Sequence, residues 1–543
     1  MFYDRLLNKS LCEREQVITM PISTRQFLRQ FFTPGAFLLF LALAFTRQSR
    51  AQNSAANGAP PPPVTFTDEQ AHQQLMHELG IQALRPAPNG DSHGPNHANY
   101  DESKANPYPN LPNALLLNNG QKVTSAGMWW NQRRPQIVHD FEQYVYGFVP
   151  KNVPKVTWSV VAQETEHIGF HLANVTVLNG HVDNSSYPLI NVNLRMTLAL
   201  PAGAKGPVPV LILFGPSGFP NPRQPTASEL ARINAAMDAL LIRQDPSLKA
   251  VIAQYPGWNP VPPVPFEFPH LNADGGLPST WQLIGANWGF AMLDPQSAQA
   301  DSAAGLTRGI IGLVNKGQPR KPDQWGALRA WAWAASQGLN YLETNPAVDA
   351  KHVGIEGVSR YGKAALVTMA FDPRFAMVLV GSSGKGGATP LRRNFGESVA
   401  NLAGGEFYWM AGNFIKYDAS KAAFGSMNPG DIPVDSNELI ALCAPRLTFI
   451  SYGIPAKGDA QWLDQRGSWM ATVAASPVWT LLGAPGLSTS DFHYRTAPMP
   501  PVNDGLLGGK LAWRQDDGGH TDAPNMVYFI QWVDKFIGYP YTN

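Results

Sequence analysis

A serine between a buried-strand pattern and a helix pattern is the first candidate for chemistry in this sequence. Val353-Gly-Ile-Glu-Gly-Val-Ser359 carries the apolar strand residues, and strong helix formers follow from Lys363. A serine on such a sharp turn presents its hydroxyl at the top of a sheet, beside the free N–H groups of a helix N-terminus. The usual Gly-x-Ser-x-Gly spacing is not met, because Tyr361 stands where the last glycine is expected and Gly362 follows. The alternative interpretation is a serine that only caps a helix.

A serine nucleophile needs a base, and only two histidines lie downstream of Ser359. In α/β-hydrolases the chain order is serine, then acid, then histidine. His520 lies in a loop between a strand pattern at 510–514 and the last helix pattern at 524–537. We therefore expect His520 to be the base. His493, in a Ser/Thr/Asp loop, is the weaker candidate.

The base in turn needs a carboxylate, which should follow the predicted strand that ends at Tyr452. Asp459 and Asp464 both qualify, and we expect Asp459 because it lies closer to the strand end. Asp464 could instead be the N-cap of a helix that runs on from Arg466. A buried carboxylate at this place would hold the imidazole of His520 in the correct tautomer.

Two cations, Arg360 and Lys363, follow the candidate nucleophile within one helical turn. Cations near a helix N-terminus oppose the helix dipole, so we expect a functional role for both. The backbone N–H of Arg360 is the expected oxyanion donor, and its guanidinium could also reach the developing negative charge.

The elements that must position these residues alternate between strands and helices from 207 to 543. The expected strands lie at 207–214, 288–294, 353–358, 374–380, 446–452 and 510–514, and the expected helices include 128–146 and 323–343, the second with Asp323 as N-cap candidate. Residues 155–200 alternate apolar and polar, which predicts antiparallel strands with turns near Asn179-Gly180 and Asn184-Ser185. The expected fold class is α/β: a doubly wound, mostly parallel sheet with antiparallel strands at its N-terminal edge, in a three-layer sandwich. The loop Gly215-Pro-Ser-Gly218 should supply a second oxyanion N–H.

Length and composition set wider bounds. The chain has 543 residues, 44% hydrophobic and 15% charged, with a net charge of +1. It can bury a large core, and the charge favours neither nucleic acid nor an anionic membrane surface as a partner. Its two cysteines, Cys12 and Cys443, provide neither a disulfide framework nor a cysteine metal cluster.

The N-terminal region is typical of an exported protein. Residues 24–51 combine a basic segment, an apolar run and the small-x-small site Ser49-Arg-Ala51, and Met20 could be the start. An uncleaved anchor is the alternative. We expect residues 1–51 to be a signal peptide, 52–120 a linker and N-terminal extension with a helix at 68–79, and 121–543 the catalytic domain. His93 and His97 lie in a polar loop of this extension and should be solvated. The expected location is secreted or periplasmic.

The string Gly357-Val-Ser-Arg-Tyr-Gly-Lys363 resembles the signature of the glucuronoyl esterases, carbohydrate esterase family 15, which have the α/β-hydrolase fold. The likeness spans about 125–540. It includes the segments 130–135, 325–333, 392–397, 462–467 and 518–520. That family cleaves the ester between 4-O-methyl-glucuronic acid on xylan and a lignin alcohol. The resemblance implies a serine esterase without metal or organic cofactor, with a polysaccharide substrate, no stable membrane association after signal cleavage, and a monomeric state.

The resemblance also implies roles for individual residues. Ser359 would be the nucleophile, His520 the base, and Arg360 the group at the oxyanion. Substrate contacts would come from Lys363 on sugar hydroxyls, Trp462 beside the uronate, Glu406 as in the fungal members, and Glu397.

The sequence departs from the fungal pattern at the acid. Fungal members carry a glutamate just after the strand that follows the elbow helix, where this chain has Ser382-Ser383. The bacterial pattern, with the acid in the later loop, supports Asp459. Val358 stands where fungal members have a disulfide cysteine, so that bridge is absent. Two alternatives stay open: an acetyl-xylan or other carbohydrate esterase on the same fold, and a sugar-binding protein without activity.

Overall fold

The computed structural model describes residues 60–91, 93–216, 227–260, 276–491 and 493–540. The predicted signal segment at 24–51 and most of the linker lie outside the described residues. The chain divides after Pro61, and Pro62–Asn543 forms one compact unit. The division at residue 120 stays a prediction.

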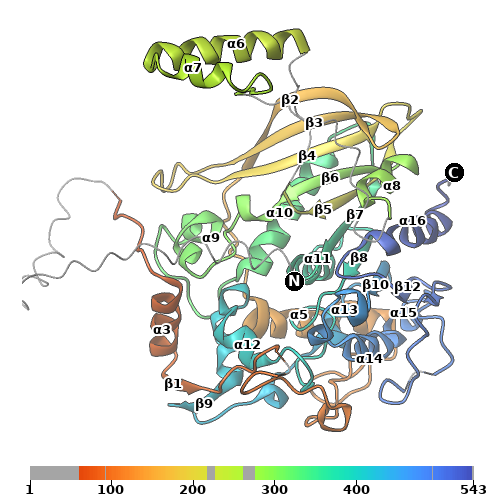
Figure 1. The fold of residues 1–543 in the computed structure, drawn as a ribbon. Helices are drawn as coiled ribbons and strands as arrows, with labels where there is room; N and C mark the ends of the chain where they lie inside the picture. The colour runs from red at the N-terminus through yellow and green to blue at the C-terminus, as the bar shows by residue number, and fades with distance from the viewer. Residues whose placement is uncertain (1–59, 92, 217–226, 261–275, 492, 541–543) are drawn as a thin grey trace, which may run out of the picture. The chain divides into compact units, whose positions relative to one another are not determined.

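A mixed ten-stranded sheet forms the centre of this unit, in the order β11-β12-β10-β8-β7-β5-β6-β4-β3-β2 (Figure 1). The strands are β2 Val156–Ile168, β3 His171–Val182, β4 Asn193–Pro201, β5 Val208–Phe214, β6 Gly289–Asp294, β7 Val348–Val358, β8 Met377–Gly381, β10 Leu447–Tyr452, β11 Gly505–Leu506 and β12 Leu511–Gln515. The six central strands, β12, β10, β8, β7, β5 and β6, pair in parallel. β4, β3 and β2 are antiparallel at one edge, and the short β11 is antiparallel at the other. The predicted sheet is confirmed.

Helices cover both faces of the sheet and give the expected three layers. The helices are α3 Asp68–Glu78, α4 Ala126–Met128, α5 Arg134–Phe141, α6 Ala227–Gln244, α7 Leu248–Ala253, α8 Ser279–Gly285, α9 Gly309–Val314, α10 Ala327–Leu342, α11 Arg360–Phe371, α12 Val399–Gly404, α13 Ser436–Ala441, α14 Gln465–Ala475, α15 Pro477–Leu481 and α16 Ala523–Ile537. One face packs against α10, α11, α13 and α14, and the other against α8 and α16, which lie side by side (Figure 1). A small second sheet pairs β1 Ile81–Leu84 with β9 Ala419–Ala422.

The core follows from the strand sequences. β5 is buried along its whole length, as expected of a continuous apolar run in the middle of a parallel sheet. Val210 and Ile212 contribute to the core beneath α10 and α11, whereas Leu211 and Leu213 contribute to the core beneath α8 and α16. The two-residue period of a strand thus divides one apolar run between both layers.

Two local predictions were wrong. Asn179-Gly180 is not a turn but lies within β3, and the hairpin bends instead at Gly169. A Cβ at Gly180 would lie 2.9 Å from the ring of Trp158, so glycine serves close packing there. α10 is capped by Gly326 rather than Asp323.

Other predicted elements are confirmed. Residues 126–146 are helical throughout, although 129–133 and 142–146 are π-helical. α3 begins after a capping box formed by Thr67 and Gln70. His93 and His97 are exposed, as expected.

Candidate active site

Ser359 lies on a strained turn between β7 and α11. Its φ of 62° and ψ of −129° are unusual for a residue other than glycine. Its N–H donates to the carbonyl of Gly381 at the end of β8, at 2.9 Å. The glycines on either side make this turn sterically accessible: a Cβ at Gly357 would lie 2.3 Å from the carbonyl oxygen of Tyr361, and one at Gly362 would lie 2.5 Å from that of Gly381. Gly362, which comes one residue later than the last glycine of the usual motif, therefore allows the carbonyl of Gly381 to approach the turn closely.

The imidazole of His520 lies against the carboxylate of Asp459, and these residues follow the neighbouring strands β12 and β10. The Nδ1 atom of His520 lies 2.8 Å from Oδ1 of Asp459. Asp459 is fully buried, and its other oxygen accepts the hydroxyl of Ser382 at 2.9 Å and the N–H of Gly453 at 3.0 Å. The imidazole is partly exposed, with 37% of its side-chain surface accessible. Nε2 is therefore the ring nitrogen left for substrate chemistry.

Hydrogen bonds to two consecutive residues, Gly381 and Ser382, connect this pair with the backbone of the serine. Ser359 bonds the backbone of Gly381, and the next residue, Ser382, bonds Asp459, which holds His520. β7, β8, β10 and β12 run parallel, so the residues that follow them gather at one edge of the sheet. The structure thus collects the predicted serine, acid and base at the carboxyl ends of the parallel strands, as ligand and catalytic groups are in α/β folds.

Asp464 has a different environment. It adopts a left-handed conformation with φ of 54°, and its carboxylate accepts the N–H of Gly467 at 2.9 Å as the N-cap of α14. It also forms a buried ion pair with Arg393, at 2.7 Å from Nε. The alternative of a helix cap is confirmed for Asp464. His493 is exposed in the loop before β11.

The guanidinium of Arg360 is held by an aspartate that sequence analysis missed. Nη1 lies 2.5 Å from Oδ2 of Asp301, and the guanidinium lies 5.4 Å from the ring centre of Trp409. Oδ1 of Asp301 accepts the indole N–H of Trp409 at 2.7 Å. Burial alone would lower the pKa of Arg360, but its bond and charge interaction with Asp301 raise it overall. A single aspartate in a loop gives no periodic signal, so nothing in the sequence identified Asp301.

The residues predicted to bind substrate form one cluster beside the end of β8. Lys363 is buried, and its Nζ donates to the carbonyl of Ser383 at 2.8 Å and to Oε2 of Glu397 at 3.3 Å. The backbone N–H of Glu397 donates to the carbonyl of Trp462 at 2.9 Å. The structure therefore brings Lys363, Glu397 and Trp462 together.

Two further side chains in this region, Glu406 and Lys385, have shifted pKa values. Burial raises the pKa of Glu406 to about 7, and the neighbouring carboxylate of Glu397 adds to this effect. Burial lowers the pKa of Lys385 to about 8, against the opposing influence of Asp464 and Glu397. Lys385 donates its backbone N–H to Glu397 at 3.0 Å and was not identified from the sequence.

The predicted second oxyanion loop, 215–218, is described only as far as Pro216, so that prediction falls largely outside the described residues. Within the described residues no group of three or more His, Cys, Asp or Glu side chains is placed to hold a metal ion. No helix in the described ranges is long and apolar enough to cross a membrane.

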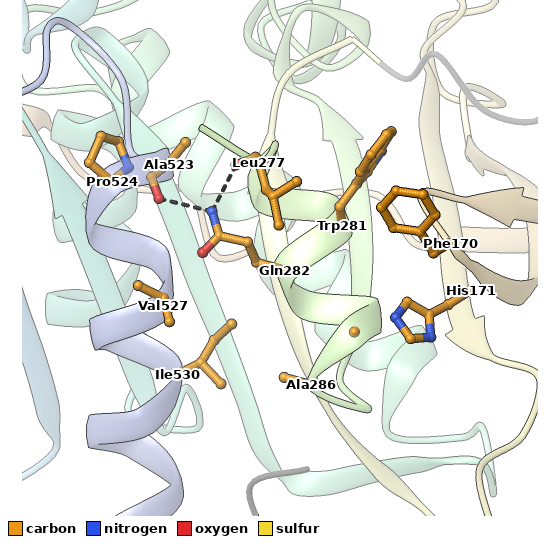
Figure 2. Close-up of a pocket in the computed structure, with 11 residues that line it drawn as sticks. Phe170, His171, Leu277, Trp281, Gln282, Ala286, Ala523, Pro524, Val527 and Ile530 are labelled. Carbon is orange, nitrogen blue, oxygen red and sulfur yellow. Dashed lines mark hydrogen bonds between the residues drawn. The ribbon is translucent and has the colours of Figure 1, made fainter. Parts of the chain in front are cut away.

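Two cavities lie near these residues. One, of about 510 Å³, lies between α8, α16 and the tip of the β2–β3 hairpin and has mostly apolar walls, including Phe170, Leu277 and Trp281 (Figure 2). None of the predicted catalytic residues lines it. A smaller cavity of about 280 Å³ is lined by Val358 and Tyr361, on either side of the candidate nucleophile.

Comparison with known proteins gives consistent matches. The family model "Glucuronyl esterase, fungi" matches residues 320–483. The chain is 38% identical to a CE15 glucuronoyl esterase structure from Teredinibacter turnerae T7901, with 87% of this chain and 100% of that chain covered and a TM-score of 0.69. A glucuronoyl esterase structure from Solibacter usitatus is 30% identical, with 80% and 99% covered and a TM-score of 0.60. A 4-O-methyl-glucuronoyl methylesterase from Phanerochaete carnosa is 30% identical over 257 residues, which cover 43% of this chain and 58% of the relative.

Proposed function

This chain belongs to carbohydrate esterase family 15, the glucuronoyl esterases, and from that premise we propose that it hydrolyses esters of 4-O-methyl-glucuronic acid through a covalent acyl-enzyme. It is a carboxylic ester hydrolase. The assignment of the individual catalytic and binding residues is the proposal developed below.

In the first half of the reaction, His520 removes the proton from Ser359 as the serine oxygen attacks the ester carbonyl. Asp459 accepts the Nδ1–H of His520, which directs Nε2 to the serine and stabilises the imidazolium. The N–H groups at the start of α11 stabilise the tetrahedral oxyanion, together with the guanidinium of Arg360.

The tetrahedral intermediate then collapses: the bond from the carbonyl carbon to the alcohol oxygen breaks, and His520 gives its proton to the departing alcohol, which leaves the acyl-enzyme. In the second half, His520 takes a proton from a water molecule. That water attacks the ester between the uronate and Ser359, the bond to the serine oxygen breaks, and the serine recovers its proton. The step needs no group beyond the chain and water.

The observation that carries this proposal is the hydrogen bond of His520 to the buried Asp459, linked through Ser382 to the strained turn of Ser359. A solvated loop histidine would have no reason to be held by a buried carboxylate whose second oxygen is already satisfied. The same contacts support a working site over the degenerate sugar-binding alternative.

The uronate, on this proposal, lies over the cluster of Lys363, Glu397, Glu406 and Trp462. The buried ammonium of Lys363 retains donor capacity beyond its two contacts, since an ammonium has three N–H groups. The ring of Trp462 offers a flat apolar surface for a sugar ring.

The wider setting of the proposal rests on the family and the N-terminal sequence. We infer that the substrate is an ester of glucuronoxylan with lignin alcohols, that residues 24–51 direct export, and that the enzyme acts as a monomer outside the cytoplasm.

The test compares wild type and Ser359→Ala on methyl and benzyl esters of glucuronic acid and on an acetylated xylo-oligosaccharide. We expect wild type to prefer the glucuronate esters, and Ser359→Ala to lose roughly 10⁶-fold in kcat, because the nucleophile acts as a unit with its base. Wild-type turnover by Ser359→Ala would contradict the mechanism. A preference for the acetyl ester would favour the other carbohydrate esterase activity, and sugar binding without any turnover would favour the inactive binding protein.

A further inference from the structure

Arg360 directly follows the proposed nucleophile as the first residue of α11, and 47% of its side chain is exposed. A side chain of this length can adopt many rotamers and turn into solvent. Its guanidinium lowers the barrier only if its N–H donors already face the oxyanion when the negative charge develops. The contacts that hold the guanidinium therefore affect the rate of the proposed reaction.

Asp301 holds the guanidinium with one of its two carboxylate oxygens. Oδ2 accepts a hydrogen bond from Nη1 of Arg360 at 2.5 Å, and Oδ1 accepts one from the indole N–H of Trp409 at 2.7 Å. Because both partners are donors, an ionised carboxylate satisfies both, whereas an amide would turn its NH₂ group towards one of them. Within the described ranges the guanidinium makes no other hydrogen bond, so its remaining N–H groups are available to the substrate.

The indole of Trp409 contacts both cations of the site. The guanidinium carbon of Arg360 lies 5.4 Å from the ring centre of Trp409, and Nζ of Lys363 lies 5.6 Å from it. Both distances are within the range of cation–π attraction. Trp409 is buried, and its carbonyl oxygen would lie 2.2 Å from a Cβ at Gly326, so its backbone packs closely against the start of α10. A fixed ring thus supports Arg360 and Lys363 together.

The loop that carries Asp301 is fixed as well. Gln299, two residues before Asp301, is fully buried. Its amide nitrogen donates to the carbonyl of Gly305 at 2.7 Å, and its Oε1 accepts the N–H of Ile311 at 3.2 Å. Its backbone carbonyl accepts the indole N–H of Trp331 on α10 at 2.8 Å. Asp301 is therefore presented to Arg360 by a loop that buried hydrogen bonds hold in place on both sides.

The ion pair between Asp301 and Arg360 has more consequence for catalysis than for stability. A pair with one half-exposed partner contributes little to the free energy of folding. Without Arg360, however, the carboxylate of Asp301 would leave an uncompensated negative charge near the developing oxyanion, and like charges repel. The acid therefore helps the reaction through the arginine and opposes it when the arginine is absent.

We propose that Asp301 and Trp409 are positioning residues that hold the guanidinium of Arg360 ready for the oxyanion. Asp301 acts through Arg360, and Trp409 acts by orienting Asp301 with its N–H and by supporting the guanidinium with its ring. The proposal rests on the proposed function and extends it to two residues that do not touch the reacting atoms.

The first experiment measures kcat and KM of wild type and Asp301→Asn on the benzyl ester of glucuronic acid. Asp301→Asn should lower kcat about 10- to 100-fold with KM nearly unchanged, because the guanidinium is misplaced for a charge that exists only in the transition state. Asp372→Asn is the matched control. Asp372 is similarly buried, pairs with Arg374 at 2.7 Å and lies at the other end of α11, so its change should leave kcat unaltered.

The second experiment repeats Asp301→Asn in an Arg360→Met background. Arg360→Met alone should lower kcat about 10²- to 10³-fold, as loss of an oxyanion donor does. In that background Asp301→Asn should leave kcat unchanged or raise it, because it removes an unpaired negative charge. A merely structural Asp301 would lower kcat by the same factor in both backgrounds, and that result would overturn the positioning role.

Trp409→Phe tests the indole N–H, since phenylalanine keeps an aromatic ring and removes the donor. It should lower kcat about tenfold in the wild-type background and not at all in the Arg360→Met background. An equal loss in both backgrounds would exclude Trp409 from the positioning of Arg360. Each of these outcomes leaves the esterase activity of wild type intact, whereas failure of wild type to hydrolyse the ester would overturn the proposed function itself.

Discussion

At the scale of single residues, two neighbouring aspartates show how environment decides role. Asp459 and Asp464 are both buried acids in one loop region. Asp459 faces an imidazole and accepts two further hydrogen bonds. Asp464 caps a helix and neutralises a buried arginine. The first arrangement orients a base, and the second stabilises the fold.

Changing each aspartate to asparagine should therefore have different effects, on catalysis for Asp459 and on stability for Asp464. Asp459→Asn should lower kcat about 10⁴-fold, because the imidazole loses its correct tautomer, with little change in stability. Asp464→Asn should lower the free energy of unfolding by about 3 kcal/mol, because Arg393 loses its buried partner, with kcat nearly retained. Steady-state kinetics and denaturant unfolding of both variants check this, and the reverse pattern would move the acid to Asp464.

Glu406 should make stability depend on pH. Its pKa in the folded protein is raised to about 7 by burial, so the folded state holds this proton more tightly than the unfolded chain. The contribution is fully present below the unfolded pKa of about 4.5 and is lost as pH rises through about 7. Glu406→Gln should therefore stabilise the protein at pH 8 by roughly 1 kcal/mol, after allowance for partial exposure, and have little effect at pH 5. Thermal unfolding of wild type and Glu406→Gln at both pH values measures this difference in stability. A larger stabilisation at pH 5 than at pH 8 would contradict a raised pKa of Glu406.

At the scale of elements, the start of α14 depends on one buried arginine. Arg393 is almost fully buried and bridges Asp464, at 2.7 Å, and Glu102 of the N-terminal extension, at 2.5 Å. Arg466, on α14 itself, also contacts Glu102, at 3.1 Å, but 41% of its side chain is exposed. The two arginines share a partner and differ in burial, which makes them a matched pair.

Arg393→Met should destabilise the fold by about 3–5 kcal/mol, because it leaves the carboxylate of Asp464 buried and unpaired. Arg466→Met should cost at most about 1 kcal/mol, as exposed ion pairs do. Urea unfolding of both variants checks the contrast. Equal losses in the free energy of unfolding would mean that burial of an ion pair does not determine its contribution to stability.

The elements were predicted well where a sequence period or a strand end determined them. The serine turn, His520 and Asp459 each follow a parallel strand, and parallel strands end at one edge of the sheet, so their approximate place follows from the sequence. Asp301 and Lys385 were missed because single charged residues in loops carry no period. Asn179-Gly180 was wrongly predicted to be a turn. Glycine is required there by a close contact with Trp158 on the neighbouring strand, and a contact between strands cannot be read from the local sequence.

At the scale of the whole molecule, the N-terminal extension is part of the unit that carries the site. The carbonyl of Ala105 accepts the N–H of Asn394 at 2.7 Å, and that of Asn99 accepts the N–H of Gly396 at 2.9 Å. A Cβ at Gly90 would lie 3.3 Å from the ring of Trp462, so this loop lies against the tryptophan that we assign to the uronate. The extension therefore supports the substrate side of the site from outside the central sheet.

Truncation tests this dependence. A chain that begins at Pro62 should keep the Tm and kcat/KM of the full chain, since Pro62–Asn543 is one compact unit. A chain that begins at Pro107 loses the partners of Asn394 and Gly396 and the contact to Trp462. It should unfold at a lower temperature, because the core loses the buried side chains of Leu75 and Ile81, and show a raised KM, because Trp462 loses its support. An unchanged Tm and KM in the shorter chain would show that the extension is dispensable.

The central claim is that one serine hydroxyl, activated by His520, forms the acyl-enzyme. Intact-mass spectrometry after treatment with a fluorophosphonate probe, followed by peptide mapping, tests this most directly. We expect wild type to gain the mass of one probe on the peptide that contains Ser359, and Ser359→Ala and His520→Ala to remain unlabelled. Labelling at another residue, or an unlabelled wild type that still hydrolyses a glucuronate ester, would contradict the account.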